Sequence, residues 1–154
     1  MNWLLNIALY QLVWFLCVLG GNRYSALALL PIALHFGLSR RRRADAILAG
    51  AALLIGMVVD GLLQLSGILI FQPAAYPIPL WLMMIWIALA TLLNHSLSWL
   101  KQRLMLAALL GAVGGALAYG SGVQLGTADL GEPRLLSLAL LAGIWGLLFP
   151  LLMV

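Results

Sequence analysis

Four polar side chains with the potential for chemistry lie inside apolar stretches of the sequence, at similar depths. His35 comes five residues before a run of arginines and His95 six residues before a lysine, so in helices both lie about 7 to 9 Å inside the membrane boundary. Asn6 lies at a similar depth, and Asn94 precedes His95. The pattern predicts one polar cluster able to handle a lipid or another hydrophobic molecule. Alternatively, each histidine is neutral and bonds to a carbonyl or a headgroup.

A second candidate is a buried acid. Asp60 is the only acid inside any predicted span, where a carboxylate costs about 2.5 to 3.5 kcal/mol at the bilayer centre. Gln64 lies one turn further on the same face. Asp60 is expected to be protonated, to bond to Gln11, or to pair with Arg23, unless it is the proton or cation site of a carrier.

A metal site of His35, His95 and Asp60 is disfavoured by depth. Asp60 lies about 21 Å from the side on which the histidines lie about 7 to 9 Å deep, whereas ligands must meet within about 2 Å of one ion. Cys17 is the only cysteine, so there is no multi-cysteine site. We therefore predict no metal and no cofactor.

These residues require membrane-spanning elements to position them. Hydrophobic residues make up 65% of the chain and charged residues 8%, far from the balance of a soluble domain. The chain is therefore predicted to be all-α, a bundle of six transmembrane helices forming a single integral membrane domain, 1–154. The expected helices are Trp3 to Leu19, Tyr24 to Leu38, Ala46 to Phe71, Leu80 to Leu100, Leu104 to Val123, and Leu135 to the terminus.

Two faces on these helices are expected to make contacts inside the protein. The helix from Leu80 to Leu100 carries a polar stripe at three- and four-residue spacing, which is typical either of hydrogen bonds between helices or of a functional cavity. The stripe consists of Thr91, Asn94, His95, Ser98 and Gln102. On the next helix, Ala107, Gly111, Gly115 and Tyr119 form a face suited to close packing, within the monomer or across a homodimer.

The basic residues predict the orientation. The loops around Arg40 and Lys101 hold six basic residues, and the loops on the other side hold two. The richer side is expected to face the cytoplasm, together with both termini. Because the charges flank apolar spans, we interpret them as orientation signals and expect no nucleic-acid partner.

The chain resembles, over essentially its whole length, a family of small bacterial inner-membrane proteins catalogued as domain of unknown function 2878. The resemblance rests on Asn6 to Trp14, Asp60, Pro79-Leu80-Trp81-Leu82, Ile85 to Leu92, and Ser96 to Leu100. It implies an inner-membrane location and a similar helix count, but no activity. It also implies a lipid-modifying enzyme, such as a cyclopropane-fatty-acid synthase, as a candidate membrane partner.

Three functions stay open at this point. The first is a small inner-membrane protein, an enzyme or an accessory subunit, that handles a lipid through Asn6, His35, Asn94 and His95. The second is a carrier that uses Asp60. The third is a structural scaffold. Convergence of the four polar residues at one place would favour the first function.

Overall fold

The computed structural model describes residues 2–154 as helices with one small two-stranded sheet. Four helices are long and apolar enough to cross a membrane. They are α1 (Trp3–Gly20), α4 (Arg42–Leu65), α6 (Leu104–Gln124) and α7 (Arg134–Leu151). The predicted all-α class is thus confirmed, and four helices could cross a membrane.

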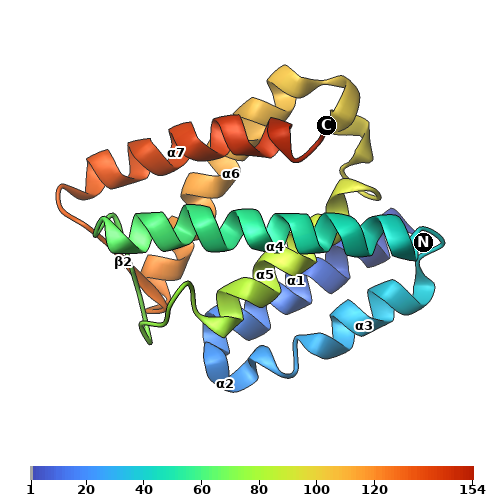
Figure 1. The fold of residues 1–154 in the computed structure, drawn as a ribbon, viewed down its shortest axis with the longest axis horizontal. Coiled ribbons are helices and arrows are strands. Elements are labelled where there is room, and N and C mark those ends of the chain that lie inside the picture. The colour runs from blue at the N-terminus through green and yellow to red at the C-terminus, as the bar shows by residue number, and fades with distance from the viewer. Residues whose placement is uncertain (1) are drawn as a thin grey trace.

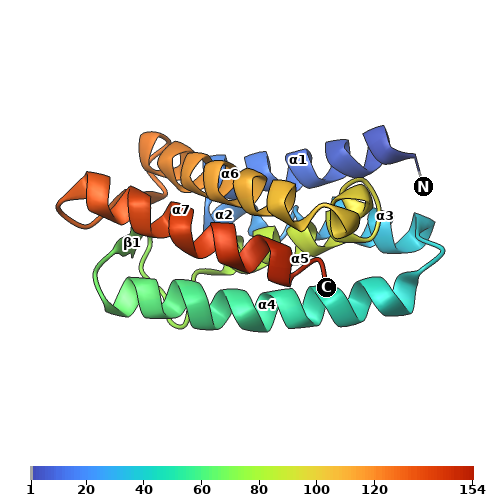
Figure 2. The same cartoon turned by 90° about the horizontal axis from the view of Figure 1, so that it is seen from above.

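The other helical segments are shorter than the roughly 20 residues that a span requires. They are α2 (Asn22–Ser25), α3 (Leu29–Leu38), α5 (Leu80–Leu93) and the 3₁₀-helix η1 (Ser98–Gln102). Six unbroken spans are therefore not confirmed. Helix α5 nevertheless lies inside the protein: eight of its 14 residues are buried, and it packs between α1 and α4 (Figure 2).

The helix expected from Tyr24 to Leu38 is broken in the structure. The regular α-helix ends at Ser25 and a new one begins at Leu29, and the residues between them form tighter turns in which amides bond to the carbonyls three residues back. Pro31 explains where α3 starts, because its nitrogen has no hydrogen to donate to the preceding turn. In the first turn of a new helix this missing donor costs nothing.

Both predicted bounds of the third helix, Ala46 and Phe71, are wrong. It starts at Arg42, so that Asp45 lies in its first turn, where a carboxylate interacts favourably with the helix dipole. It ends at Leu65, because Gly67 adopts a φ of 75°. The amides of Gly67 and Ile68 then bond to the carbonyls of Gln64 and Leu63, the pattern of a Schellman helix end.

Helix α6 ends with the same turn, and the two turns lead into the sheet. Gly126 has a φ of 82°, and Thr127 donates its amide to the Gly122 carbonyl. The strands that follow are β1 (Leu69–Phe71) and β2 (Ala128–Leu130), which pair antiparallel. This sheet was not predicted, and it joins the ends of α4 and α6.

The loops gather at two ends of the bundle (Figure 1). One end holds the start of α1, the link between α3 and α4, η1 and the C-terminus; we call it the basic end, because Arg40 to Arg43 and Lys101 lie there. The sheet lies at the opposite end. The loops predicted to lie on one side of the membrane therefore lie at one end of the bundle. Which end faces the cytoplasm stays a prediction.

Helices α6 and α7 pack mainly against each other, as Figure 1 shows. Gly115 makes this possible, since a Cβ atom there would lie 2.3 Å from Cγ of Trp145. Gly111 meets Phe149 in the same way, at 2.5 Å from its Cβ. The small face predicted on this helix therefore packs within the monomer, and a homodimer stays a prediction.

Candidate functional site

Asp45 is the centre of a polar cluster at the basic end. Its side chain is 0% exposed. One carboxylate oxygen, Oδ2, accepts a hydrogen bond from Ser39 Oγ at 2.5 Å. The other oxygen, Oδ1, accepts from Asn94 Nδ2 at 3.1 Å. A buried carboxylate without such donors would be very costly, so these contacts stabilise Asp45 in its buried position.

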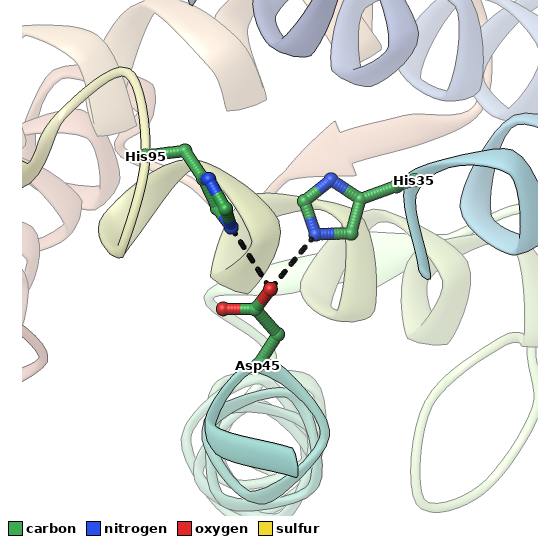
Figure 3. Close-up of side chains that lie close together, drawn as sticks. All are labelled: His35, Asp45 and His95. Carbon is green, nitrogen blue, oxygen red and sulfur yellow. Dashed lines mark hydrogen bonds and ion pairs between the residues drawn. The ribbon is translucent and has the colours of Figure 1, made fainter. Parts of the chain in front are cut away.

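Two histidines complete the set of partners of this carboxylate. Nε2 of His95 lies 2.8 Å from Asp45 Oδ2, and Nε2 of His35 lies 3.4 Å from the same atom. Figure 3 shows the two rings turned toward Asp45 from different segments of the chain. The rings meet edge to face with centroids 5.0 Å apart. His35 is buried, whereas the side chain of His95 is 12% exposed.

Asn6 connects α1 to the cluster and to the end of α5. Its Oδ1 accepts from the amide of Ser96 at 3.1 Å and from the Ser96 hydroxyl. Its Nδ2 donates to the carbonyl of Thr91 at 3.2 Å and faces Nδ1 of His35 at 3.4 Å. The four residues predicted to converge, Asn6, His35, Asn94 and His95, are thus brought together. Their role as a functional site stays a prediction.

These contacts set the tautomer of His35. The Ser96 amide can only donate and the Thr91 carbonyl can only accept, so the oxygen and nitrogen of the Asn6 amide are not interchangeable. Nδ2 of Asn6 therefore donates to Nδ1 of His35, which must be the acceptor. The hydrogen of a neutral His35 then lies on Nε2 and points at Asp45.

The same contacts test whether the cluster fits a metal ion. Nε2 of His95 and of His35 lie 2.8 and 3.4 Å from Asp45 Oδ2, and the three ligand atoms lie within 4.8 Å of one another; ligands of a tetrahedral zinc site are about 3.3 Å apart, so the spacing alone does not decide. A histidine that binds metal through Nε2 usually donates its Nδ1 hydrogen to an acceptor. Nδ1 of His35 instead faces the Asn6 donor. The surroundings therefore fit a hydrogen-bonded carboxylate better than a metal centre.

The expected polar stripe on one helix is corrected by the structure. Helix α5 ends at Leu93, and Asn94 and His95 lie in the turn that follows. Ser98 and Gln102 are exposed in η1. Thr91 donates only to the carbonyl of Ala88 in its own helix. Asn94 and His95 reach Asp45 because the chain leaves the helix, not because they share a helical face.

The basic end also carries positive charge around the cluster. Lys101 Nζ donates to Asn94 Oδ1 at 3.0 Å, which turns the amide nitrogen of Asn94 toward Asp45. Arg42 bonds to the carbonyls of Gly37 and Ser39 and thereby covers the end of α3. The other three arginines of the run are exposed.

Asp60 lies elsewhere, with partners that were not predicted. It is 0% exposed. Trp86 Nε1 donates to Oδ2 at 2.7 Å, and the Tyr119 hydroxyl donates to Oδ1 at 2.5 Å. Among residues 2–154, no ion pair reaches Asp60. The bonds connect α4 to α5 and α6, so the geometry accounts for this acid as a structural link.

The predicted partners of Asp60 lie away from it. Gln11 is exposed on α1. Arg23 is exposed and lies over the ring of Tyr24, 5.8 Å from its centroid. Gln64 donates to the carbonyl of Ala75 at 3.0 Å and so holds the proline-rich loop. The expected bond to Gln11 and the expected pair with Arg23 are therefore wrong.

The expectation that Asp60 is the only acid inside a span is also wrong, because Asp45 lies within α4. Its position beside four arginines favoured a solvated loop. One signal could have found it: an acid three residues into a long apolar helix is well placed in the first turn. Tyrosine and tryptophan as partners of Asp60 could have been considered too, since both keep a polar atom when buried.

The chain matches a known protein family. A family model described as "Protein of unknown function (DUF2878)" matches residues 3–151. No curated protein and no solved structure matches the chain. The match confirms the family expected from the sequence and assigns no activity.

Proposed function

We propose a function from the residues themselves, because the chain belongs to the DUF2878 family of proteins of unknown function. In this proposal, His95 accepts a proton from, or donates one to, the polar group of a lipid-like molecule. The single observation that carries this proposal is the buried carboxylate of Asp45 with His95 bonded to it at 2.8 Å. A carboxylate that orients an imidazole is a common arrangement in general-base catalysis.

His95 is the member of the histidine pair that a substrate can reach. His35 is enclosed, with Asn6 on one ring nitrogen and Asp45 near the other. His95 is partly exposed, and in the described part of the chain no side-chain hydrogen bond engages its Nδ1. If Nε2 donates to Asp45, Nδ1 is left as a proton acceptor. Asp45 also stabilises the imidazolium that forms on proton uptake.

The surroundings of His95 favour an amphiphilic substrate. Leu92 and Leu97 flank its turn and line an apolar cavity. The exposed arginines of Arg40 to Arg43 lie at the same end of the protein, and each basic residue near a membrane surface attracts anionic lipids by about 1 kcal/mol. A molecule with an apolar chain and a polar headgroup could contact both the apolar cavity and the exposed arginines.

The test is the lipid composition of bacteria that express the protein. We expect expression to change the extracted lipids, as measured by mass spectrometry, and we expect His95→Asn to slow that change by about 10²- to 10⁴-fold. His95→Asn should accumulate in the membrane like the wild type, since the partly exposed His95 contributes one of several bonds to Asp45.

The control is Gln102→Ala, which removes an exposed polar side chain from η1 at the same end. It should leave the lipid change intact. The proposal is wrong if His95→Asn at equal abundance produces the same lipid change. It is also wrong if the wild type produces none.

The proposed location is the bacterial inner membrane, with six crossings. Two of them would be broken, one through α2 and α3 and one through α5 and η1. This is supported by the positions of their ends, which alternate between the two ends of the bundle. Irregular backbone is tolerated at membrane depth where protein covers it, and α5 is covered by α1 and α4.

We expect both termini to be cytoplasmic, because the basic end holds six of the eight lysines and arginines. A reporter enzyme that is active only in the periplasm should be silent when fused after Val154. The same reporter inserted at Tyr76, in the proline-rich loop of the opposite end, should be active. Activity after Val154 with silence at Tyr76 would reverse the orientation.

The carrier alternative has less support. A coupling carboxylate needs access to water and exchangeable contacts, whereas both oxygens of Asp60 accept hydrogen bonds from buried aromatic side chains. The His95→Asn experiment distinguishes an enzyme from a structural scaffold, because only an enzyme would change the lipids in a way that depends on His95.

A further inference from the structure

The positive charge of the chain is concentrated at the basic end and has almost no acidic counterpart there (Figure 1). Six of the eight lysines and arginines lie at this end, and Asp45 is the only acidic side chain among them. The six are Arg40 to Arg43, Lys101 and Arg103. Within residues 2–154, no ion pair involves any of them. The counterions of these cations must therefore come from outside the protein.

Lys101 brings one of these charges next to the candidate site. Its ammonium group donates to Oδ1 of Asn94 at 3.0 Å, and Nδ2 of the same amide donates to Asp45 at 3.1 Å. His95, which follows Asn94 in the chain, lies 2.8 Å from the other oxygen of Asp45. A single amide group thus separates the ammonium of Lys101 from the carboxylate that orients His95.

The ammonium of Lys101 has unused capacity for hydrogen bonds. A lysine side chain offers three donors, and in the described part of the chain its bond to Asn94 is the only one it makes. The side chain is exposed. The neighbouring Arg103 instead lies over the ring of Trp99, 5.7 Å from its centroid. Lys101 is therefore a positioned cation with two donors left for an anionic partner.

The segment that carries Lys101 has the character of a membrane interface. Trp99 is 48% exposed, and tryptophan is enriched at the level of the lipid headgroups. Leu100 is 0% exposed, so it anchors the segment in the protein. Lipid phosphates lie at this level, and lysine commonly binds phosphate as a point charge.

We infer that Lys101 binds the phosphate of an anionic phospholipid and so places the lipid headgroup beside His95. In phosphatidylglycerol, the negative charge of the phosphate has no cation in the same headgroup, whereas phosphatidylcholine carries its own. The inference rests on the proposed function only in taking this lipid as the substrate. Binding itself needs no chemistry at His95.

Three substitutions test the role of the ammonium group. Lys101→Gln removes the charge but keeps an N–H donor for Asn94, so the orientation of Asn94 toward Asp45 is retained. Lys101→Arg keeps the charge. Arg103→Gln is the matched control, because it removes one exposed positive charge two residues away from a guanidinium that lies over Trp99.

The experiment compares two lipids with identical acyl chains. Each protein is reconstituted in nanodiscs of equal parts phosphatidylglycerol and phosphatidylcholine, returned to detergent, passed through size exclusion and examined by native mass spectrometry. The wild type should retain phosphatidylglycerol in preference to phosphatidylcholine. Lys101→Gln should lower this preference by about tenfold or more, because a charge-assisted hydrogen bond is lost. Lys101→Arg and His95→Asn should keep the preference.

Arg103→Gln distinguishes a binding site from general surface charge. It should lower the preference by less than about twofold, because isolated exposed charges contribute little. Equal losses in Lys101→Gln and Arg103→Gln would overturn the inference, since surface charge alone would then account for retention. A loss in Lys101→Arg as large as that in Lys101→Gln would overturn it too.

A competition distinguishes a lipid from free phosphate. Inorganic phosphate is added to the detergent sample, with sodium chloride of equal ionic strength as the control. Neither salt should displace the retained phosphatidylglycerol, because its acyl chains also contribute to binding by burying apolar surface. Displacement by phosphate alone would indicate a site for free phosphate, and displacement by both salts would indicate unspecific attraction. Either result would overturn the inference.

The two proposals can fail separately. If Lys101→Gln loses the preference while His95→Asn still changes the lipids in cells, the proposed function alone fails. If His95→Asn abolishes the lipid change while Lys101→Gln keeps the preference, this inference alone fails. Loss of the preference in Lys101→Gln together with loss of the lipid change in His95→Asn supports both.

Discussion

Asp45→Asn is expected to lower the free energy of unfolding by about 3 to 5 kcal/mol, the usual cost of leaving a buried charge network without one partner. The carboxylate accepts hydrogen bonds from Ser39 and Asn94, with both histidines beside it. An amide offers one oxygen and one nitrogen in place of two accepting oxygens. Its nitrogen must therefore face a donor.

The surrounding contacts prevent these donors from adapting. Lys101 holds the oxygen of Asn94, so the nitrogen of Asn94 stays turned toward position 45. Asn6 holds Nδ1 of His35, so the hydrogen of His35 stays on Nε2. Only His95 and the hydroxyl of Ser39 can reorient. Whichever way the new amide turns, at least one pair of donors is left facing each other.

The measurement is an unfolding titration with sodium dodecyl sulfate in mixed micelles, followed by circular dichroism. The control is Asp129→Asn, which removes the partner of Arg134 at 3.5 Å on a half-exposed side chain. That change should cost no more than about 1 kcal/mol, as for other surface ion pairs. Equal effects at the two positions would contradict the network described for Asp45.

The common level of Asn6, His35, Asn94 and His95 could be predicted from their depth, whereas their contact depends on the turn after α5. The arginine run and Lys101 mark one boundary, and residues at equal distance from that boundary must lie at one level of the bundle. The identity of the central acid could not be predicted in this way. Asp45 follows the arginines directly, and the apolar pattern starts only after it.

The helix ends, too, could be predicted only in part. Residues 104–123 form one helix as expected, because no proline and no charged residue interrupts the apolar run. Leu69–Phe71 is as apolar as the helix before it, so hydropathy alone extended that helix too far. The positive φ of Gly67 ends it, and pairing with Ala128–Leu130 then makes the segment a strand. That pairing depends on contact between residues far apart in sequence.

Asp60→Asn, in contrast to Asp45→Asn, is expected to change the free energy of unfolding by only about 1 kcal/mol. The oxygen of the new amide can accept from Trp86, whose indole can only donate. The nitrogen of the amide can donate to Tyr119, because a tyrosine hydroxyl can also accept. The same substitution at two fully buried acids should thus have different results, because only one set of partners can reverse its direction.

Asp60→Leu should cost about 2 to 6 kcal/mol, since it leaves the Trp86 and Tyr119 donors unpaired at about 1 to 3 kcal/mol each. Tyr119→Phe should be costly in the wild type and nearly neutral in Asp60→Leu, because the bond it removes is already gone. The sodium dodecyl sulfate titration gives all four free energies. If Asp60→Asn is as harmful as Asp60→Leu, the acid is needed as a charge, and the carrier alternative regains support. If Asp60→Asn is tolerated and the cycle shows coupling, Asp60 is a hydrogen-bonded link between α4, α5 and α6.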